Sequence, residues 1–180
     1  MSEEDGLRCW QAARSGDRDA MSDLLRRYQD LIFRFCHSRL SDQSAAVEAT
    51  QETAFRIISH IRRFEGRGKL TTWILGIANN VCREQQRLKH KWQQHDETEP
   101  PAHPVADDHS DHLIEIESVE QINCAIARLP DRQREAVILR YFESLPLSEV
   151  ADVMGVSDGT VKATLSHALK KLKINFDEIR

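Results

Sequence analysis

The sequence is poor in the residues that β-rich folds depend on. Among 180 residues it has 7 glycines and 5 prolines, and aromatic residues make up 6% of the chain. The abundant residues are Leu, Ala, Arg, Glu and Gln, which favour helices. Because tight turns between strands rely on glycine and proline, we expect neither a β-sandwich nor a barrel. The length suits one or two small domains, so we predict an all-α protein.

Long apolar runs and paired cysteines are also missing. Residues 1–5 are acidic, whereas a secretory signal begins with positive charge followed by an apolar stretch. We therefore expect a cytoplasmic protein without membrane insertion. The cysteines lack C-x-x-C spacing, which indicates reduced packing residues rather than a disulfide or zinc framework. They are Cys9, Cys36, Cys82 and Cys124.

Three enzyme motifs that depend on local spacing are also missing. The chain has no P-loop, no H-E-x-x-H pair and no glycine-rich dinucleotide motif. We therefore expect a protein that is not an enzyme and that needs no cofactor.

Charge is distributed unevenly along the chain. Residues 62–94 carry eight basic and two acidic side chains, whereas residues 95–117 carry eight acidic side chains and no Lys or Arg. The acidic segment also holds three prolines and few apolar residues, so it cannot bury enough surface to fold alone. We predict two domains, at 1–94 and 116–180, joined by a flexible acidic linker at 95–115.

Hydrophobic periodicity predicts helices on both sides of this linker. Before it, apolar residues recur at three- and four-residue steps over 24–35, 47–61 and 70–88. With a short leading helix at 7–13, these segments predict a helical bundle. After the linker, an apolar stripe ends at Pro130. We expect Asp131 to cap a further helix that runs towards Phe142.

Residues 147–161 have the spacing of a helix-turn-helix. Gly155 stands at the turn, Ser157 is a good N-cap for the second helix, and Val161 returns to the core. The second helix would turn its outward-facing positions towards a DNA groove. We expect these to be Ser157, Thr160, Lys162, Ala163, Thr164, His167 and Lys170. For the lysines near its end, a solvated helix terminus opposing the dipole is a second interpretation.

The order of these parts resembles the bacterial sigma factors of the extracytoplasmic-function (ECF) group of the sigma-70 family. Residues 27–34, and Gln51-Glu52 with the apolar helix that follows, resemble its polymerase-binding segments. Residues 64–80 resemble the loop and helix that open and read the minus-10 promoter element. Residues 129–136 and 159–162 resemble the domain that reads the minus-35 element. The resemblance covers almost the whole chain.

This resemblance implies a sigma-2-like helical bundle followed by a sigma-4-like helix-turn-helix domain. It implies a protein that binds core RNA polymerase at the β′ clamp and β flap, recognises both promoter elements and promotes DNA melting. It further implies an anti-sigma factor as a partner. The location implied is the cytoplasm, with nucleoid association when the protein is in the holoenzyme.

The same resemblance assigns roles to individual residues. Basic side chains neutralise phosphates, aromatic rings stack on bases, and amides offer donors and acceptors to base edges. The minus-10 element would contact Arg63, Phe64, Lys69, Trp73, Asn79, Asn80, Arg83 and Arg87. Core polymerase would contact Tyr28, Arg34, Glu48, Gln51, Glu52 and Phe55. Core packing is a second interpretation for Trp73, and a solvated helix face is one for the two asparagines.

Two departures from the family pattern keep other functions open. Thr164 and His167 stand where the family usually has arginines, and Glu48 alone keeps a carboxylate in the run that precedes Gln51. One alternative is a helix-turn-helix regulator that binds duplex DNA without polymerase. Another is a sigma-like protein with weakened minus-35 recognition.

The acidic linker itself has two interpretations. It is either an unstructured spacer or, as the resemblance implies, a polyanion that lies in the polymerase channel in place of nascent RNA. Its histidines are loosely spaced and no cysteine accompanies them, so we interpret them as incidental and expect no metal site. They are His95, His103, His109 and His112.

Overall fold

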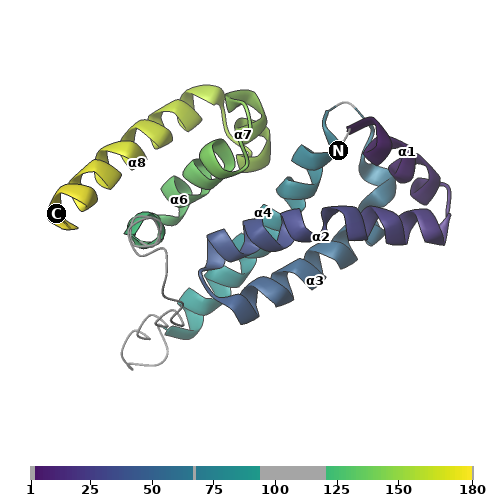
Figure 1. Ribbon diagram of the computed structural model, residues 1–180, viewed down its shortest axis with the longest axis horizontal. Helices are drawn as coiled ribbons and strands as arrows, with labels where there is room; N and C mark the ends of the chain where they lie inside the picture. The colour runs from purple at the N-terminus through teal and green to yellow at the C-terminus, as the bar shows by residue number, and fades with distance from the viewer. Residues whose placement is uncertain (1–2, 67, 94–120, 180) are drawn as a thin grey trace, which may run out of the picture.

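The computed structural model describes residues 3–66, 68–93 and 121–179, and its regular elements there are all helical. This confirms the all-α prediction for the described part of the chain. The helices form two groups (Figure 1). The first contains α1 (Glu3–Arg14), α2 (Arg18–Leu40), α3 (Gln43–His60), the short 3-10 helix η1 (Ile61–Arg63) and α4 (Leu70–Gln93). The second contains a helical stretch at 121–127, α6 (Asp131–Val137), the π-helical turn η2 (Ile138–Phe142), α7 (Leu147–Met154) and α8 (Asp158–Ile179).

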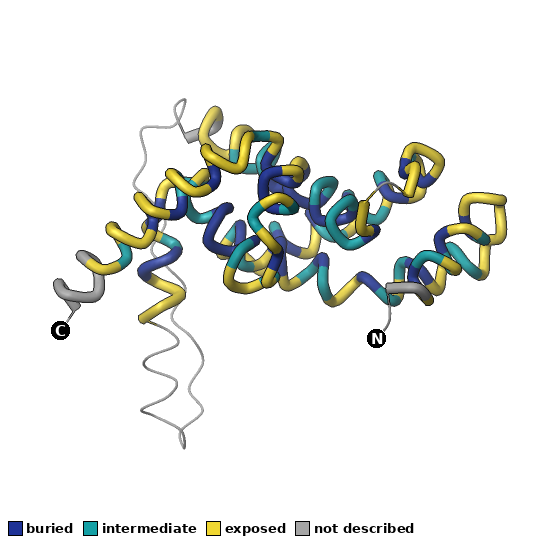
Figure 2. Tube along the Cα trace, turned by 90° about the horizontal axis from the view of Figure 1, so that it is seen from above, coloured by how far each residue is buried: buried dark blue, intermediate teal, exposed yellow. Residues whose placement is uncertain are grey.

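The first group is a bundle built on the predicted apolar stripes. Each of its long helices turns one apolar face inwards, and the largest side chains there are almost fully buried (Figure 2). They include Leu24, Ile32 and Phe35 of α2, Ile57 of α3, and Leu70, Ile74 and Leu75 of α4.

Aspartates begin two of these helices. The Asp17 carboxylate accepts hydrogen bonds from the N–H groups of Asp19 and Ala20, and the Asp42 carboxylate accepts one from Ala45 at 2.7 Å. Both satisfy amide groups that lack partners in the first turn of a helix. These caps fix where α2 and α3 start, and so they fix the register of the faces that the two helices bury.

The second group contains the predicted helix-turn-helix, with one correction before it. Pro130, not Asp131, is the N-cap of α6, and it provides no side-chain cap. The helix that follows changes to π-helical hydrogen bonding over η2. The predicted turn is confirmed, because Gly155 adopts a left-handed conformation with φ of 67° and its N–H donates to the last carbonyls of α7. Glycine suits this position because it has no Cβ to clash there.

The two groups are in contact, with α7 against α4 and η2 against α2. The predicted linker at 95–115 and its four histidines lie outside the described residues, so the domain boundaries remain predictions. Within the described residues, no three His, Cys, Asp or Glu side chains gather as a metal site would require. In the same part of the chain, no helix combines the length and apolar character of a membrane span.

Candidate nucleic-acid and polymerase surfaces

Phe64 anchors the loop that precedes α4. Its ring packs edge-on against Trp10 at a centroid distance of 5.0 Å and lies 5.4 Å from the tilted ring of Trp73. Phe64 is buried and Trp73 is half-buried. The predicted minus-10 residue Phe64 therefore faces the protein core in this conformation, and Trp73 takes part in the same packing. Arg63 and Lys69, which flank the loop, remain exposed.

The two asparagines of α4 point to different environments. Asn80 is exposed, whereas Asn79 is completely buried against the second helical group. The Asn79 Nδ2 donates to Glu135 Oε1 at 2.9 Å and to the Val153 carbonyl at 3.4 Å. In this conformation Asn79 therefore lies neither on a solvated helix face nor where it could contact DNA. Asn80 alone remains available to a base edge.

Arg83, one helical turn beyond Asn79, holds the same carboxylate. Its Nη2 pairs with Glu135 Oε1, and its Nε donates to Glu135 Oε2 at 3.2 Å. The same Nη2 donates to the Met154 carbonyl at 3.0 Å. Because guanidinium and carboxylate meet in a two-pronged pair, the contact fixes the orientation of α6 relative to α4.

Arg39, at the end of α2, completes this cluster and was not among the residues singled out from the sequence. It is fully buried, and its Nη2 lies 3.7 Å from Glu135 Oε2. Its Nη1 donates to the Asp131 carbonyl at 3.2 Å, and its Nη2 to Gln86 Oε1 at 3.3 Å. Burial lowers the pKa of Arg39, and the Glu135 carboxylate opposes that shift. Arg39 continues the apolar stripe Leu24-Tyr28-Ile32-Phe35. A charged residue at such a core-facing position indicates that an oppositely charged partner is buried beside it.

A second acidic residue of the second helical group, Glu149 of α7, reaches the loop before α4. Glu149 Oε1 lies 2.6 Å from Lys69 Nζ, and its Oε2 accepts a hydrogen bond from Thr72 Oγ1 at 2.7 Å. Burial alone would raise the pKa of Glu149. The hydrogen bonds from Lys69 and Thr72 outweigh burial and leave that pKa below its ordinary value. Lys69, a predicted minus-10 residue, is therefore paired with the second group.

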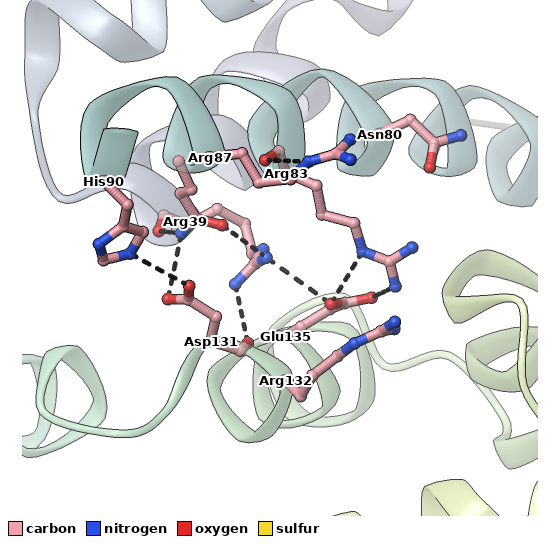
Figure 3. A pocket seen from close by; sticks show the side chains of 9 residues that line it. Arg39, Asn80, Arg83, Arg87, His90, Asp131, Arg132 and Glu135 are labelled. Atoms are coloured by element: carbon pink, nitrogen blue, oxygen red, sulfur yellow. Dashed lines mark hydrogen bonds and ion pairs between the residues drawn. The ribbon is translucent and has the colours of Figure 1, made fainter. Parts of the chain in front are cut away.

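A groove of about 410 Å³ lies along the contact between α4 and α6 (Figure 3). In Figure 3, Arg83 points from α4 towards Glu135 on α6. Arg87 is exposed on the same side of α4 and donates to the Arg83 carbonyl at 3.4 Å. The groove is lined by Arg39, Asn80, Arg83, Gln86, Arg87, His90, Asp131, Arg132 and Glu135.

Helix α3 carries an exposed apolar strip on its outer face. Phe55 is 64% exposed, and Val47 and Ile58 are also largely exposed. Among the predicted polymerase-binding residues, Glu48 and Gln51 lie exposed on this helix. A set of apolar side chains left in solvent on one helix is typical of a binding surface. We call Val47, Phe55 and Ile58 the α3 strip.

The other predicted polymerase-binding residues have mixed environments. Glu52 accepts a hydrogen bond from Arg56 Nε at 2.7 Å, and Arg56 also binds Glu84 of α4. The hydrogen bond from Arg56 holds the pKa of Glu84 below its ordinary value. Arg34 is exposed on α2, whereas Tyr28 is buried against α1.

The predicted recognition helix is exposed as expected. Ser157 Oγ accepts a hydrogen bond from the Thr160 N–H at 3.3 Å, which confirms Ser157 as the cap of α8. The Thr164 hydroxyl donates to the Thr160 carbonyl at 2.8 Å, so its proton is used within the helix. Thr164 is half-buried. The exposed positions are Ser157, Thr160, Lys162, Ala163, His167 and Lys170.

Residues 155–159 spell G-x-S-x-G, the spacing of the nucleophile turn in many hydrolases. In those enzymes the turn links a strand to a helix, whereas here it links α7 to α8. Ser157 Oγ is engaged as a helix cap and lies 3.0 Å from Thr160 Oγ1. The pattern here therefore belongs to helix capping rather than to catalysis.

Two models of known protein families match different parts of the chain. Residues 24–92 match the model for sigma-70 region 2, and residues 119–172 match the model for sigma-70 region 4. The first match spans α2 to α4 with their polymerase and minus-10 candidates. The second spans the helix-turn-helix.

Curated relatives and solved structures agree with these matches. The chain is 28% identical to the ECF RNA polymerase sigma factor SigW of Bacillus subtilis over 89% of its length and 90% of the relative. It is 30% identical to the ECF RNA polymerase sigma factor SigC of Mycobacterium tuberculosis, over 87% of its length and 83% of the relative.

Two solved structures share the fold. CnrH, in complex with the cytosolic domain of CnrY, superposes with a TM-score of 0.70 at 17% identity, covering 94% of this chain and 96% of CnrH. The sigma factor RpoE of Bartonella quintana, in complex with the anti-sigma factor NepR, superposes with a TM-score of 0.70 at 23% identity, covering 88% and 98%. Matching regions, full-length relatives and an exposed helix-turn-helix beside a basic helix together show that this chain belongs to the ECF sigma factors of the sigma-70 family.

Proposed function

We propose that this chain binds core RNA polymerase and directs it to promoters with defined minus-10 and minus-35 elements, where it promotes DNA melting. The α3 strip would dock on the β′ clamp, and the helix-turn-helix domain would also contact the β flap. The role is one of binding and strand separation rather than covalent chemistry. It places the protein in the cytoplasm, on the nucleoid when it is in the holoenzyme.

The observation that carries this proposal is the α3 strip. Its apolar side chains are exposed although the rest of α3 buries its inner face, and they lie on a different helix from the two candidate DNA surfaces. A regulator that only binds duplex DNA has no need of such a strip. A protein that must hold polymerase and DNA at once needs separate surfaces for each.

The two candidate DNA surfaces differ in character, which suits two different promoter elements. The loop and α4 combine cations with Asn80, a set suited to phosphates and to base edges of an open strand. Helix α8 offers a capped N-terminus with hydroxyls and Lys162, a set suited to the major groove of a duplex.

The proposal is tested by run-off transcription and by binding to purified core polymerase. Phe55→Ser should abolish co-elution with core enzyme and reduce transcription, because it removes the most exposed apolar side chain of the α3 strip. Leu88→Ser is the matched control, since Leu88 is an exposed apolar residue of α4 outside the strip. If core polymerase never starts transcripts with the wild-type chain, the proposal is wrong.

We also propose an anti-sigma factor as a regulatory partner. RpoE was solved with an anti-sigma factor bound and CnrH with the cytosolic domain of CnrY, and this chain shares their fold. A groove of about 410 Å³ between α2 and the segment after η2 offers a place for a partner segment. It is lined by Arg27, Tyr28, Leu31, Arg34, Lys69, Thr71, Glu143, Ser144, Leu145, Pro146 and Glu149.

A further inference from the structure

We propose that the helix-turn-helix domain acts as an internal competitor of minus-10 DNA, with the carboxylates of Glu135 and Glu149 holding the side chains that would otherwise bind the promoter. This inference rests on the proposed function, because it concerns the same α4 surface. It adds that the free chain closes on itself without any partner protein.

The first support is the identity of the paired residues. Glu135 binds Asn79 and Arg83, and Glu149 binds Lys69. All three partners are among the residues that the sequence assigns to the minus-10 element. A carboxylate resembles a phosphate in charge and in its ability to accept a two-pronged arginine pair. The helix-turn-helix domain therefore presents the chemistry of DNA to the surface that would bind DNA.

The second support is that Glu135 has its partners on the opposite domain. It is 1% exposed, and its hydrogen bonds and ion pairs within the described residues go to Arg39 of α2 and to Asn79 and Arg83 of α4. A buried carboxylate without a partner is strongly unfavourable, so its burial requires the first domain to be in place. When the domains separate, Glu135 returns to water and its three partners are freed together.

The third support is that polar bonds accompany the apolar packing between the two groups, whose buried apolar residues form one continuous core. Hydrogen bonds between α4 and the second group run from Arg83 to the Met154 carbonyl, from Thr72 to Glu149 and from Asn79 to the Val153 carbonyl. Polar bonds of this kind can be exchanged for bonds to water when the domains separate. The closed state is therefore suited to reversible opening, and DNA must displace the carboxylates in order to bind.

The expected consequence is a lower apparent affinity of the free chain for an open minus-10 strand. When only a fraction of the molecules is open, the apparent dissociation constant rises by the inverse of that fraction. A closed population of about nine in ten molecules would weaken binding about tenfold. Removing the carboxylate charges should therefore tighten DNA binding by the same factor, although it adds no contact to DNA.

The test uses the full chain without polymerase. Glu135→Gln/Glu149→Gln is compared with the wild type by small-angle scattering and by binding to a fluorescent single-stranded oligonucleotide library. The control Asp152→Asn/Asp158→Asn removes the same charge from exposed positions of the same domain. Circular dichroism checks that each variant is folded, and the single variant Glu149→Gln is used if the double one is not.

An expanded double variant that binds oligonucleotides about tenfold more tightly, with a compact control that does not, supports the inference. A wild type already as expanded as the double variant overturns it. So does a variant that expands without tighter binding. Run-off transcription with core enzyme separates these failures from a failure of the proposed function. A chain whose two domains do not associate can still start transcripts.

Discussion

Asn79 and Glu135 meet across the contact between the two helical groups, with the Asn79 amide donating to the Glu135 carboxylate at 2.9 Å although 56 positions separate them in sequence. The pair lies beside Arg39 and Arg83, which bind the same carboxylate. Through this one acidic side chain, α6 is tied to both α2 and α4. Changes on α4 should therefore separate into effects on DNA and effects on the domain contact.

A change at Asn80 should affect DNA binding and not the domain contact, because Asn80 is exposed and makes no bond to Glu135 in the described structure. We predict that Asn80→Ala reduces open-complex formation on a cognate promoter about tenfold, the loss expected when one amide contact to a base edge is removed. Core polymerase binding should not change. Gln11→Ala, an amide truncation on the exposed face of α1, is the control and should leave both unchanged. Loss of core binding by Asn80→Ala would mean that this face meets polymerase instead.

Phe64 should act through packing, since its ring lies between Trp10 and Trp73. We predict that Phe64→Ala lowers the free energy of unfolding by about 3 kcal/mol through the cavity it leaves. Phe64→Leu, which keeps most of the volume, should cost about 1 kcal/mol. Urea unfolding measures both. If Phe64→Leu is as stable as the wild type yet forms no open complexes, the ring must contact DNA directly.

The recognition helix should gain phosphate contacts when its missing arginines are supplied. We predict that Thr164→Arg/His167→Arg binds a minus-35 duplex more tightly. Each new phosphate contact should steepen the dependence of log affinity on log salt by about 0.9. Ser166→Arg places a charge on a neighbouring exposed position and is the control. Equal gains from both variants would show a general charge effect rather than contacts at these two positions.

The local features of this fold could be predicted from sequence, and the contact between the domains could not. The turn at Gly155 and the cap at Ser157 depend on residues a few positions apart, so spacing alone identifies them. Glu135 and Glu149 find partners more than fifty positions away, and no local pattern encodes such a pair. Arg39 did carry a signal, because it continues the apolar stripe of α2 and is buried there.

The separation of the site residues follows from the same cause. Helical periodicity places Asn79 and Asn80 on adjacent faces of α4, about 100° apart, but does not say which face a second domain will cover. The structure turns Asn79 inwards and leaves Asn80 in solvent. In this closed arrangement, Asn80 is therefore the one of the two that is exposed for the proposed DNA contact.

Acid should open the contact between the domains through Glu149. Its pKa in the closed state lies below its ordinary value of about 4.3, which is the value expected once the domains separate. A carboxylate whose pKa is lower in the closed state stabilises that state above the open-state pKa and stops doing so as the pH falls through the closed-state pKa. We predict that the wild type expands in small-angle scattering as the pH falls below this open-state value, while circular dichroism still shows helix.

Glu149→Gln should weaken this acid-dependent expansion, because the amide has no proton to gain, while Lys69 and Thr72 still face it. Glu84→Gln is the matched control. Its carboxylate also has a lowered pKa, but its partner Arg56 lies within the first group, so the change affects that group and not the contact between domains. The Glu84 variant should therefore expand over the same pH range as the wild type. If the Glu149 variant also expands as the wild type does, acid acts on the contact through groups other than Glu149.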